Sequence, residues 1–212
     1  MEAIKKIAWL RDRLQQPLPG REAQEKMMGR VRPMPPAIPE NARPSAVLCL
    51  LYPVDAVLNM LLIKRIEDGK AHSGQISFPG GKQDPTDADI RSTALREANE
   101  EVGVMSAEVD IIGALTPLYI PVSNFQVYPF VGYMEQRPEF YLSQSEVAGL
   151  LEISIDDLLH PDVKTMVQVT SPALPDLSMK VRAYKLEEHI VWGATAMIIS
   201  ELETVLTEYK EL

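Results

Sequence analysis

Three glutamates with helical spacing are the residues of this chain best suited to chemistry. Glu97, Glu100 and Glu101 stand at positions i, i+3 and i+4, so they share one face of the helix expected over residues 88–102. Like charges at this spacing destabilise an isolated helix by about 0.2–0.5 kcal/mol per pair. Carboxylate oxygens select hard cations, so the three predict a Mg²⁺ or Mn²⁺ site that keeps positions open for phosphate oxygens. A solvated acidic helix face explains the same residues about as well.

The residues on either side of this helix favour the site over the solvated face. Gly80 and Gly81 precede it and permit the close approach of a ligand to the backbone, so Gly80 is a candidate for substrate contact. A backbone carbonyl here, assigned to Gly81, is a candidate metal ligand. Gly103 is expected to end the helix in the left-handed conformation, and Asp87 is expected to cap its start.

The same stretch resembles the Nudix box, G-x5-E-x7-R-E-U-x-E-E-x-G-U, where U is a bulky aliphatic residue. The matching residues are Gly81, Arg96, Glu97, Glu100, Glu101, Gly103 and Val104. Asp87 stands at the first Glu, the interval from Gly81 to Arg96 is one residue longer, and Ala98 is small for its position. The resemblance implies a Nudix diphosphatase with an α/β (α+β) fold, in which helices sandwich a mixed β-sheet. It also implies that Glu97, Glu100 and Glu101 bind metal and that Arg96 orients a catalytic carboxylate.

An upstream segment resembles the added signature of the coenzyme A diphosphatase branch, which yields 3′,5′-ADP and a 4′-phosphopantetheine product. The residues that carry this resemblance are Leu61-Leu62-Ile63-Lys64-Arg65, His72, Gly74-Gln75 and Phe78-Pro79-Gly80-Gly81. Three positions differ from that signature. Ile63 stands where Thr is usual, Ile66 where Ser or Ala is usual, and Lys70 where Arg is usual. Arg65, Lys70 and His72 are candidate phosphate or substrate contacts, although a solvated strand end or an exposed loop accounts for them nearly as well.

The attacking water needs a base, for which Glu100 and Glu146 are both candidates. Glu146 is equally consistent with a carboxylate at a helix start. Two alternatives to coenzyme A hydrolysis stay open at this point. The first is a Nudix hydrolase of another nucleoside diphosphate derivative, such as ADP-ribose, an NDP-sugar or a nucleotide. The second is a non-catalytic protein that binds nucleotide.

The composition limits the partners of this protein. The net charge of −9 argues against nucleic acid, because an acidic chain repels a polyanion, and favours a small-molecule diphosphate substrate. The single cysteine, Cys49, lies in an apolar run and is expected in a core strand of a protein kept in a reducing compartment. Without a targeting segment or an apolar run long enough to span a bilayer, no membrane association is expected, and the location is expected to be cytoplasmic. The sequence leaves open whether the protein forms a homodimer.

The elements that must position these residues follow from periodicity and turn signals. Residues 1–44 are expected to form a helix (2–16) and a Pro-rich arm packed on the domain, and residues 45–212 the catalytic domain. A second helix of the domain is expected over about 194–209, and residues 142–159 as a loop with short helices. Strands are expected at 46–52, 57–65, 108–118, 126–134, 163–170 and 179–189, with a turn at 53–55.

Overall fold

The computed structural model describes residues 2–28, 38–67, 69, 73–171 and 174–209. In chain order the elements are α1 (Glu2–Arg13), α2 (Gly20–Glu25), β1 (Arg43–Val54), β2 (Val57–Arg65), β3 (Ile76–Ser77), β4 (Gly80–Lys82), α3 (Ile90–Val102), a 3₁₀ turn (Ser106–Glu108), β5 (Asp110–Ala114), β6 (Leu118–Ile120), β7 (Phe125–Tyr133), β8 (Val147–Ser154), α4 (Ile155–Leu158), a second 3₁₀ turn (Pro161–Val163), β9 (Lys164–Ser171), β10 (Leu174–Leu186), β11 (His189–Trp192) and α5 (Gly193–Leu206).

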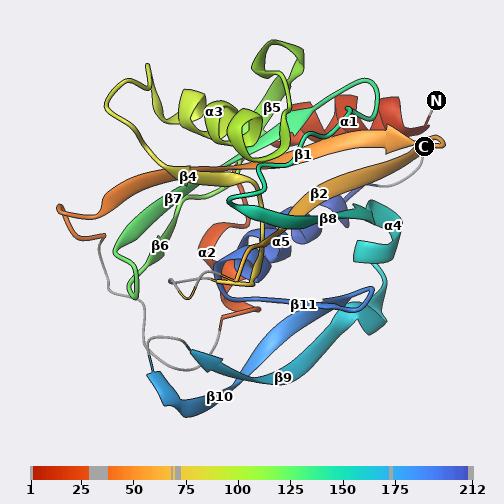
Figure 1. The fold of residues 1–212 in the computed structure, drawn as a ribbon. Helices are drawn as coiled ribbons and strands as arrows, with labels where there is room; N and C mark the ends of the chain where they lie inside the picture. The colour runs from red at the N-terminus through yellow and green to blue at the C-terminus, as the bar shows by residue number, and fades with distance from the viewer. Residues whose placement is uncertain (1, 29–37, 68, 70–72, 172–173, 210–212) are drawn as a thin grey trace.

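The main sheet is mixed and has eight strands, with the order β3-β2-β1-β7-β5 along its path. β1 pairs in parallel with β7, whereas every other pairing in this sheet is antiparallel. Figure 1 shows α3 above this sheet and α5 below it, with the three-stranded sheet β9–β11 beyond α5. The predicted architecture, a mixed sheet between helices, is therefore confirmed.

β1 shows why both faces of the sheet are covered. Its side chains point alternately to opposite faces, as strand geometry requires. Leu48 and Leu50 belong to the hydrophobic cluster beneath α3, while Cys49 and Leu51 belong to the cluster that includes α1 and α5. All four are fully buried, so the run reads as continuously apolar. Cys49 is a core residue as predicted, and burial raises the pKa of its thiol.

The predicted helices and most of the predicted strands are present, with shifted ends. The turn between β1 and β2 lies at Asp55 and Ala56, both with positive φ, rather than at residues 53–55. The expected strand over 108–118 is interrupted, because β5 ends at Ala114. The expectation of a loop with short helices over 142–159 is wrong for its central eight residues: β8 occupies Val147–Ser154 and pairs with β2 across seven register positions from Asn59 to Arg65. The short helix α4 follows it, as expected.

A buried carboxylate joins the N-terminal helices to the rest of the fold. Glu201 on α5 is fully buried and accepts hydrogen bonds from Gly20 N at 3.0 Å and from Gln24 Nε2 at 2.9 Å, both on α2. Thr116, between β5 and β6, donates two further hydrogen bonds to Glu201: one from its Oγ1 to Oε1 at 2.6 Å and one from its backbone N–H to Oε2. No basic side chain of the described residues pairs with Glu201, so these donors alone compensate for its lost hydration.

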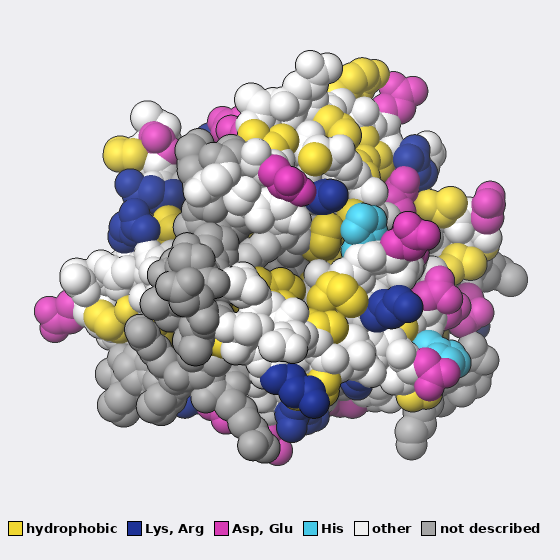
Figure 2. Space-filling model, turned by 60° about the horizontal axis from the view of Figure 1, so that its bottom comes forward, with side chains coloured by type: hydrophobic (Ala, Val, Ile, Leu, Met, Phe, Trp, Pro, Cys, Tyr) yellow, Lys and Arg dark blue, Asp and Glu magenta, His cyan; other side chains and the backbone are white. Residues whose placement is uncertain are grey.

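The surface offers no broad basic face in the view of Figure 2. There the Lys and Arg side chains form small groups between Asp and Glu side chains. Among the described residues, no helix combines the length and the hydrophobicity needed to cross a membrane.

The Glu201 contacts predict a large loss of stability for Glu201→Gln. The amide NH₂ of glutamine would face donors where a carboxylate oxygen now accepts, leaving buried N–H or O–H groups unpaired. We expect the free energy of unfolding to fall by about 3 kcal/mol, measured by urea denaturation.

Glu208→Gln is the matched control, because Glu208 lies just after the same helix but is exposed and pairs with Arg13. Its loss should stay below about 1 kcal/mol. Equal losses in the two variants would contradict the role given to Glu201.

Candidate functional site

The centre of the site is Glu101, a carboxylate with almost no access to solvent. Its side chain is 1 % exposed, and both of its oxygens are engaged. Gly80 N donates to Oε2 at 2.8 Å, and Arg65 Nη1 donates to Oε1 at 3.1 Å. Burial is the main cause that raises the pKa of Glu101, to about 7, and the charges of Glu97 and Glu146 act in the same direction.

The two glycines before α3 are required by close contact. Gly80 has φ of 155°, and a Cβ there would lie 2.3 Å from the carbonyl oxygen of Ala46 on β1. A Cβ on Gly81 would lie 2.5 Å from the carboxylate of Glu97. Any larger residue would push β4 away from β1 or from α3. The glycine pair therefore lets two carboxylates lie directly against one backbone segment.

Arg96 holds the remaining acidic side chains of α3. Its Nη2 donates to Glu97 Oε1 and its Nη1 to Glu100 Oε2, each at 2.9 Å. The side chain of Glu97 is 15 % exposed and that of Glu100 is 56 % exposed. Burial raises the pKa of Glu97, and the Arg96 charge opposes this shift. One guanidinium thus offsets the repulsion that the sequence pattern creates on this face.

Asp87 has a different role from the one expected, and the prediction that it caps the helix is wrong. Asp89 is the N-cap: its Oδ1 accepts from Ser92 N at 2.7 Å, and its backbone N–H donates to Ser92 Oγ at 3.0 Å. Asp87 instead binds Arg96 with both oxygens, at 2.8 and 3.1 Å. These bonds from Arg96 are the main cause that lowers the pKa of Asp87 to about 2.

A loop that follows β7 brings Glu146 to the same site. Tyr141 N donates to Val102 O and Ser143 N to Glu101 O, so the loop wraps around the C-terminal end of α3. Gly103 ends that helix with φ of 75°, as expected. The Glu146 carboxylate is exposed, and its charge contributes to the raised pKa values of Glu97 and Glu101. Only the fold could show this proximity, since 45 residues separate Glu146 from Glu101 in the sequence.

The structure therefore brings together most of the predicted site residues. Glu97, Glu100, Glu101, Arg96, Gly80, Gly81, Arg65 and Glu146 form one region, whereas Lys70 and His72 lie outside the described residues. The carboxylate oxygens are turned toward Arg96, Arg65 and Gly80 N rather than toward a common point. Accordingly, within the described part of the chain no three Asp, Glu, His or Cys side chains are arranged closely enough to hold a metal ion.

Comparison with known proteins agrees with this geometry. A family model described as the NUDIX domain matches residues 42–173, which span β1 to β9 and include the whole site. An uncharacterized Nudix hydrolase, NudL, from Yersinia enterocolitica is 35% identical over 175 residues, which cover 81% of this chain and 85% of that protein. A second NudL, from Pectobacterium atrosepticum, is 36% identical over 154 residues, or 70% of this chain and 76% of the relative.

Solved structures with the same fold are more distant in sequence. A MutT/nudix family protein from Enterococcus faecalis superposes with a TM-score of 0.52 and 17% identity, covering 83% of this chain and 66% of that one. The Nudix hydrolase RenU from M. smegmatis gives a TM-score of 0.50 and 15% identity, covering 81% and 89%. At this identity the likeness concerns the fold alone. With the family model and the NudL relatives, the conclusion is that this chain belongs to the Nudix hydrolase family.

Proposed function

We propose that this Nudix hydrolase cleaves the diphosphate linkage of coenzyme A or a coenzyme A derivative. The products would be 3′,5′-ADP and a 4′-phosphopantetheine compound. Membership of the family supports a diphosphate-containing small molecule as the substrate. The more specific part rests on one observation: the segment that resembles the coenzyme A branch contacts the acidic helix directly. Arg65 and Gly80, which both belong to this segment, are the two groups that hold Glu101.

The donor set of the site suits a hard divalent cation, in keeping with the divalent ions that Nudix hydrolases generally use. Glu97, Glu100 and Glu101, with the carbonyl of Gly81, would hold Mg²⁺ or Mn²⁺ through oxygen atoms only. Two of these carboxylates are largely withdrawn from water, which favours pairing with a cation. When bound, the cation would lower the pKa of a coordinated water and neutralise charge on the diphosphate.

The chain's own residues would orient the reactants and move the proton. Arg96 fixes Glu97 and Glu100 relative to each other. Glu146 is the preferred base, because its carboxylate makes no hydrogen bond or ion pair with another described residue, whereas Glu100 accepts from Arg96. Arg65 has a side chain 33% exposed and lies at the rim of the site, so it could reach a phosphate from its place beside Glu101. Gly80 acts by positioning Glu101 through its N–H.

A substrate panel tests the assignment. The protein is incubated with Mn²⁺ and coenzyme A, acetyl coenzyme A, ADP-ribose or an NDP-sugar, and the products are separated by chromatography. We expect the highest kcat/KM for a coenzyme A compound, with 3′,5′-ADP as one product. Faster turnover of ADP-ribose or the NDP-sugar would replace coenzyme A as the substrate. Binding without turnover of any compound would favour a non-catalytic protein.

Glu101→Gln is the control that ties the activity to this site. Glutamine keeps the size of the side chain but not the charge, so activity should fall by about 100-fold or more. Unchanged activity in this variant would show that the measured reaction belongs elsewhere in the protein or to a contaminant.

Two isosteric variants distinguish the candidate bases. Glu146→Gln should lower kcat by about 100- to 10,000-fold while Mn²⁺ affinity changes little, since proton transfer is lost and the cation ligands remain. Glu100→Gln should weaken Mn²⁺ binding, measured by titration calorimetry. If Glu100→Gln lowers kcat at saturating Mn²⁺ and Glu146→Gln does not, Glu100 is the base instead.

Asp87→Asn tests the anchor of Arg96 through pH. The pKa of Asp87 is about 2, below its ordinary 3.8, so its stabilising effect is complete above about pH 4 and is lost as the pH falls toward 2. At pH 7 the variant should lose about 2 kcal/mol of unfolding free energy, and this gap should close under acid, measured by urea denaturation. Its kcat should fall by about 10- to 100-fold, because Arg96 then holds Glu97 and Glu100 less firmly.

Asp84→Asn serves as the control for that variant, since it makes the same charge change in an exposed position of the same loop. We expect a smaller loss of stability and little change in kcat. A gap between Asp87→Asn and the unsubstituted protein that stays at its neutral-pH size at pH 2 and below would contradict the pairing with Arg96.

A further inference from the structure

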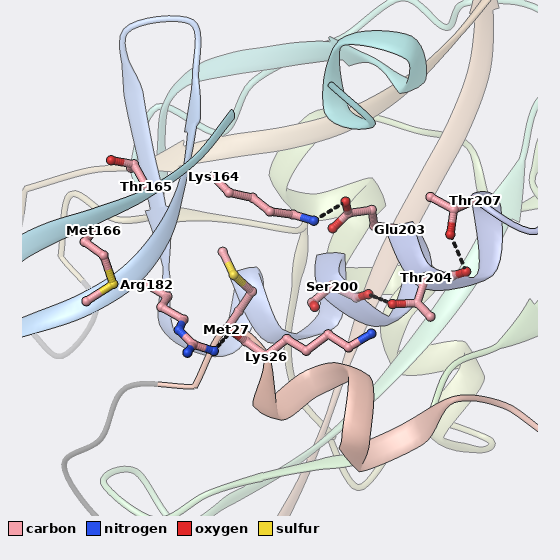
Figure 3. Close-up of a pocket in the computed structure, with 10 residues that line it drawn as sticks. All are labelled: Lys26, Met27, Lys164, Thr165, Met166, Arg182, Ser200, Glu203, Thr204 and Thr207. Atoms are coloured by element: carbon pink, nitrogen blue, oxygen red, sulfur yellow. Dashed lines mark hydrogen bonds and ion pairs between the residues drawn. The ribbon is translucent and has the colours of Figure 1, made fainter. Parts of the chain in front are cut away.

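A cavity lies on the opposite side of the main sheet from α3 and the diphosphate site. It has a volume of about 680 Å³ and is lined by residues of the turn that follows α2, of α5 and of the β9–β10 hairpin. Cavities that bind small molecules have volumes of roughly 300–1,000 Å³. Figure 3 shows side chains from all three of these elements around it. Its size therefore suits a small molecule rather than a macromolecule.

The lining is basic although the chain is acidic. Lys26, Lys164 and Arg182 face the cavity, and Glu203 is the single carboxylate among the described residues that line it, so their formal charge is 3 − 1 = +2. Glu203 is already committed, because Lys164 Nζ lies 2.5 Å from its Oε1 and Tyr184 donates to its Oε2 at 2.6 Å. Neither Lys26 nor Arg182 forms an ion pair with a described acidic residue. Two uncompensated cations thus face one space.

These two cations are placed differently. Arg182 Nη1 donates to the carbonyl oxygen of Lys26 at 2.7 Å, which holds the guanidinium at one side of the cavity. The ammonium group of Lys26 extends along α5 toward Thr204 in Figure 3. A guanidinium with donors to spare and a mobile ammonium are the usual partners of phosphate oxygens. A phosphate monoester, which carries close to two negative charges, would balance the excess charge of the lining.

The rest of the lining suits an apolar portion of the same ligand. Met27 is 4% exposed and Met166 is 49% exposed, so one methionine forms the base of the cavity and the other stands at its edge. Flexible thioether side chains adapt to ligands of differing shape. The Ser200 hydroxyl donates to the carbonyl oxygen of Ala23, and the Thr204 hydroxyl donates to the carbonyl oxygen of Ser200, each at 2.7 Å. The hydroxyl hydrogens of this part of the lining are therefore already used within the protein.

We propose that this cavity is a second ligand site, which binds a small phosphate monoester with an apolar substituent. The phosphate would lie between Lys26 and Arg182, and the apolar part against Met27 and Met166. The site is separate from the diphosphate site in residues and in position. It therefore does not depend on the identity of the substrate cleaved there.

Phenyl phosphate and inorganic phosphate are the probes, used on the full chain in EDTA and followed by titration calorimetry. EDTA removes the divalent cations that would draw a phosphate to the acidic helix. We expect phenyl phosphate to bind more tightly than inorganic phosphate. Lys26→Gln and Arg182→Gln should each weaken its binding by about 10-fold, which equals about 1.4 kcal/mol.

Lys185→Gln is the matched control, because Lys185 is exposed on β10 like Arg182 but does not line the cavity. It should leave the affinity unchanged. Met166→Thr should weaken phenyl phosphate and spare inorganic phosphate. If neither probe binds at millimolar concentrations, or if Lys185→Gln weakens binding as much as Lys26→Gln does, the proposal is overturned. Lys26→Gln keeps the backbone bond to Arg182, so a loss seen there cannot be attributed to a displaced guanidinium.

Discussion

The arrangement of the site depends on the burial of the Glu101 carboxylate. A charged group withdrawn from water needs donors, and here the backbone of Gly80 and the side chain of Arg65 supply them. These two bonds connect α3, the end of β2 and the start of β4 at one point. They also explain why position 80 must be glycine, since any Cβ would meet β1. The glycine segment, the strand end and the acidic helix are therefore one structural unit.

A single arginine offsets the repulsion between the carboxylates on the acidic face of α3. Arg96 contacts Asp87, Glu97 and Glu100 together, so three negative charges share one positive charge that all of them need. Asp87 accepts from Arg96 through both of its carboxylate oxygens, and this pairing lowers its pKa. A cation entering the site would compete with Arg96 and Arg65 for the same oxygens. These contacts would have to open for the proposed cation to bind.

The two faces of the sheet carry side chains of opposite charge. On the α3 face, acidic side chains gather around a backbone segment, which suits a cation and a diphosphate. On the α5 face, basic side chains gather around a cavity between α2 and the β9–β10 hairpin. Glu201 ties α2 to α5 and thereby helps to form one wall of that cavity. The net charge of −9 hides this separation, because a total says nothing about where the charges lie.

Local patterns predicted the three long helices and most of the strands, because their apolar residues recur with the period of the element. The short helix α2 lies in the segment expected to form a Pro-rich arm and was not predicted. β8 was missed because its eight residues include Gly149 and Glu152, and its strand conformation depends on pairing with β2, about 90 residues earlier. Such pairing is non-local and leaves a weak trace in the strand's own residues. The expected turn at 53–55 overlaps the observed turn at Asp55 and Ala56 only in Asp55, for a similar reason, since register decides where a hairpin reverses.

The acidic helix and its flanking glycines could be read from the chain alone, because helical spacing places Glu97, Glu100 and Glu101 on one face; the hard-cation site stays a prediction from the same spacing. The sequence also indicated the family through the residues around them. Which groups hold these carboxylates follows from the three-dimensional fold and not from the local sequence. In the fold, Asp87 binds Arg96 instead of capping the helix, and Arg65 donates to Glu101. Glu146 lies close enough to Glu97 and Glu101 to affect their pKa values, and the basic cavity lies on the other side of the sheet. These contacts join residues distant in the chain, and their geometry is set by how strands pair and helices pack, which no local pattern records.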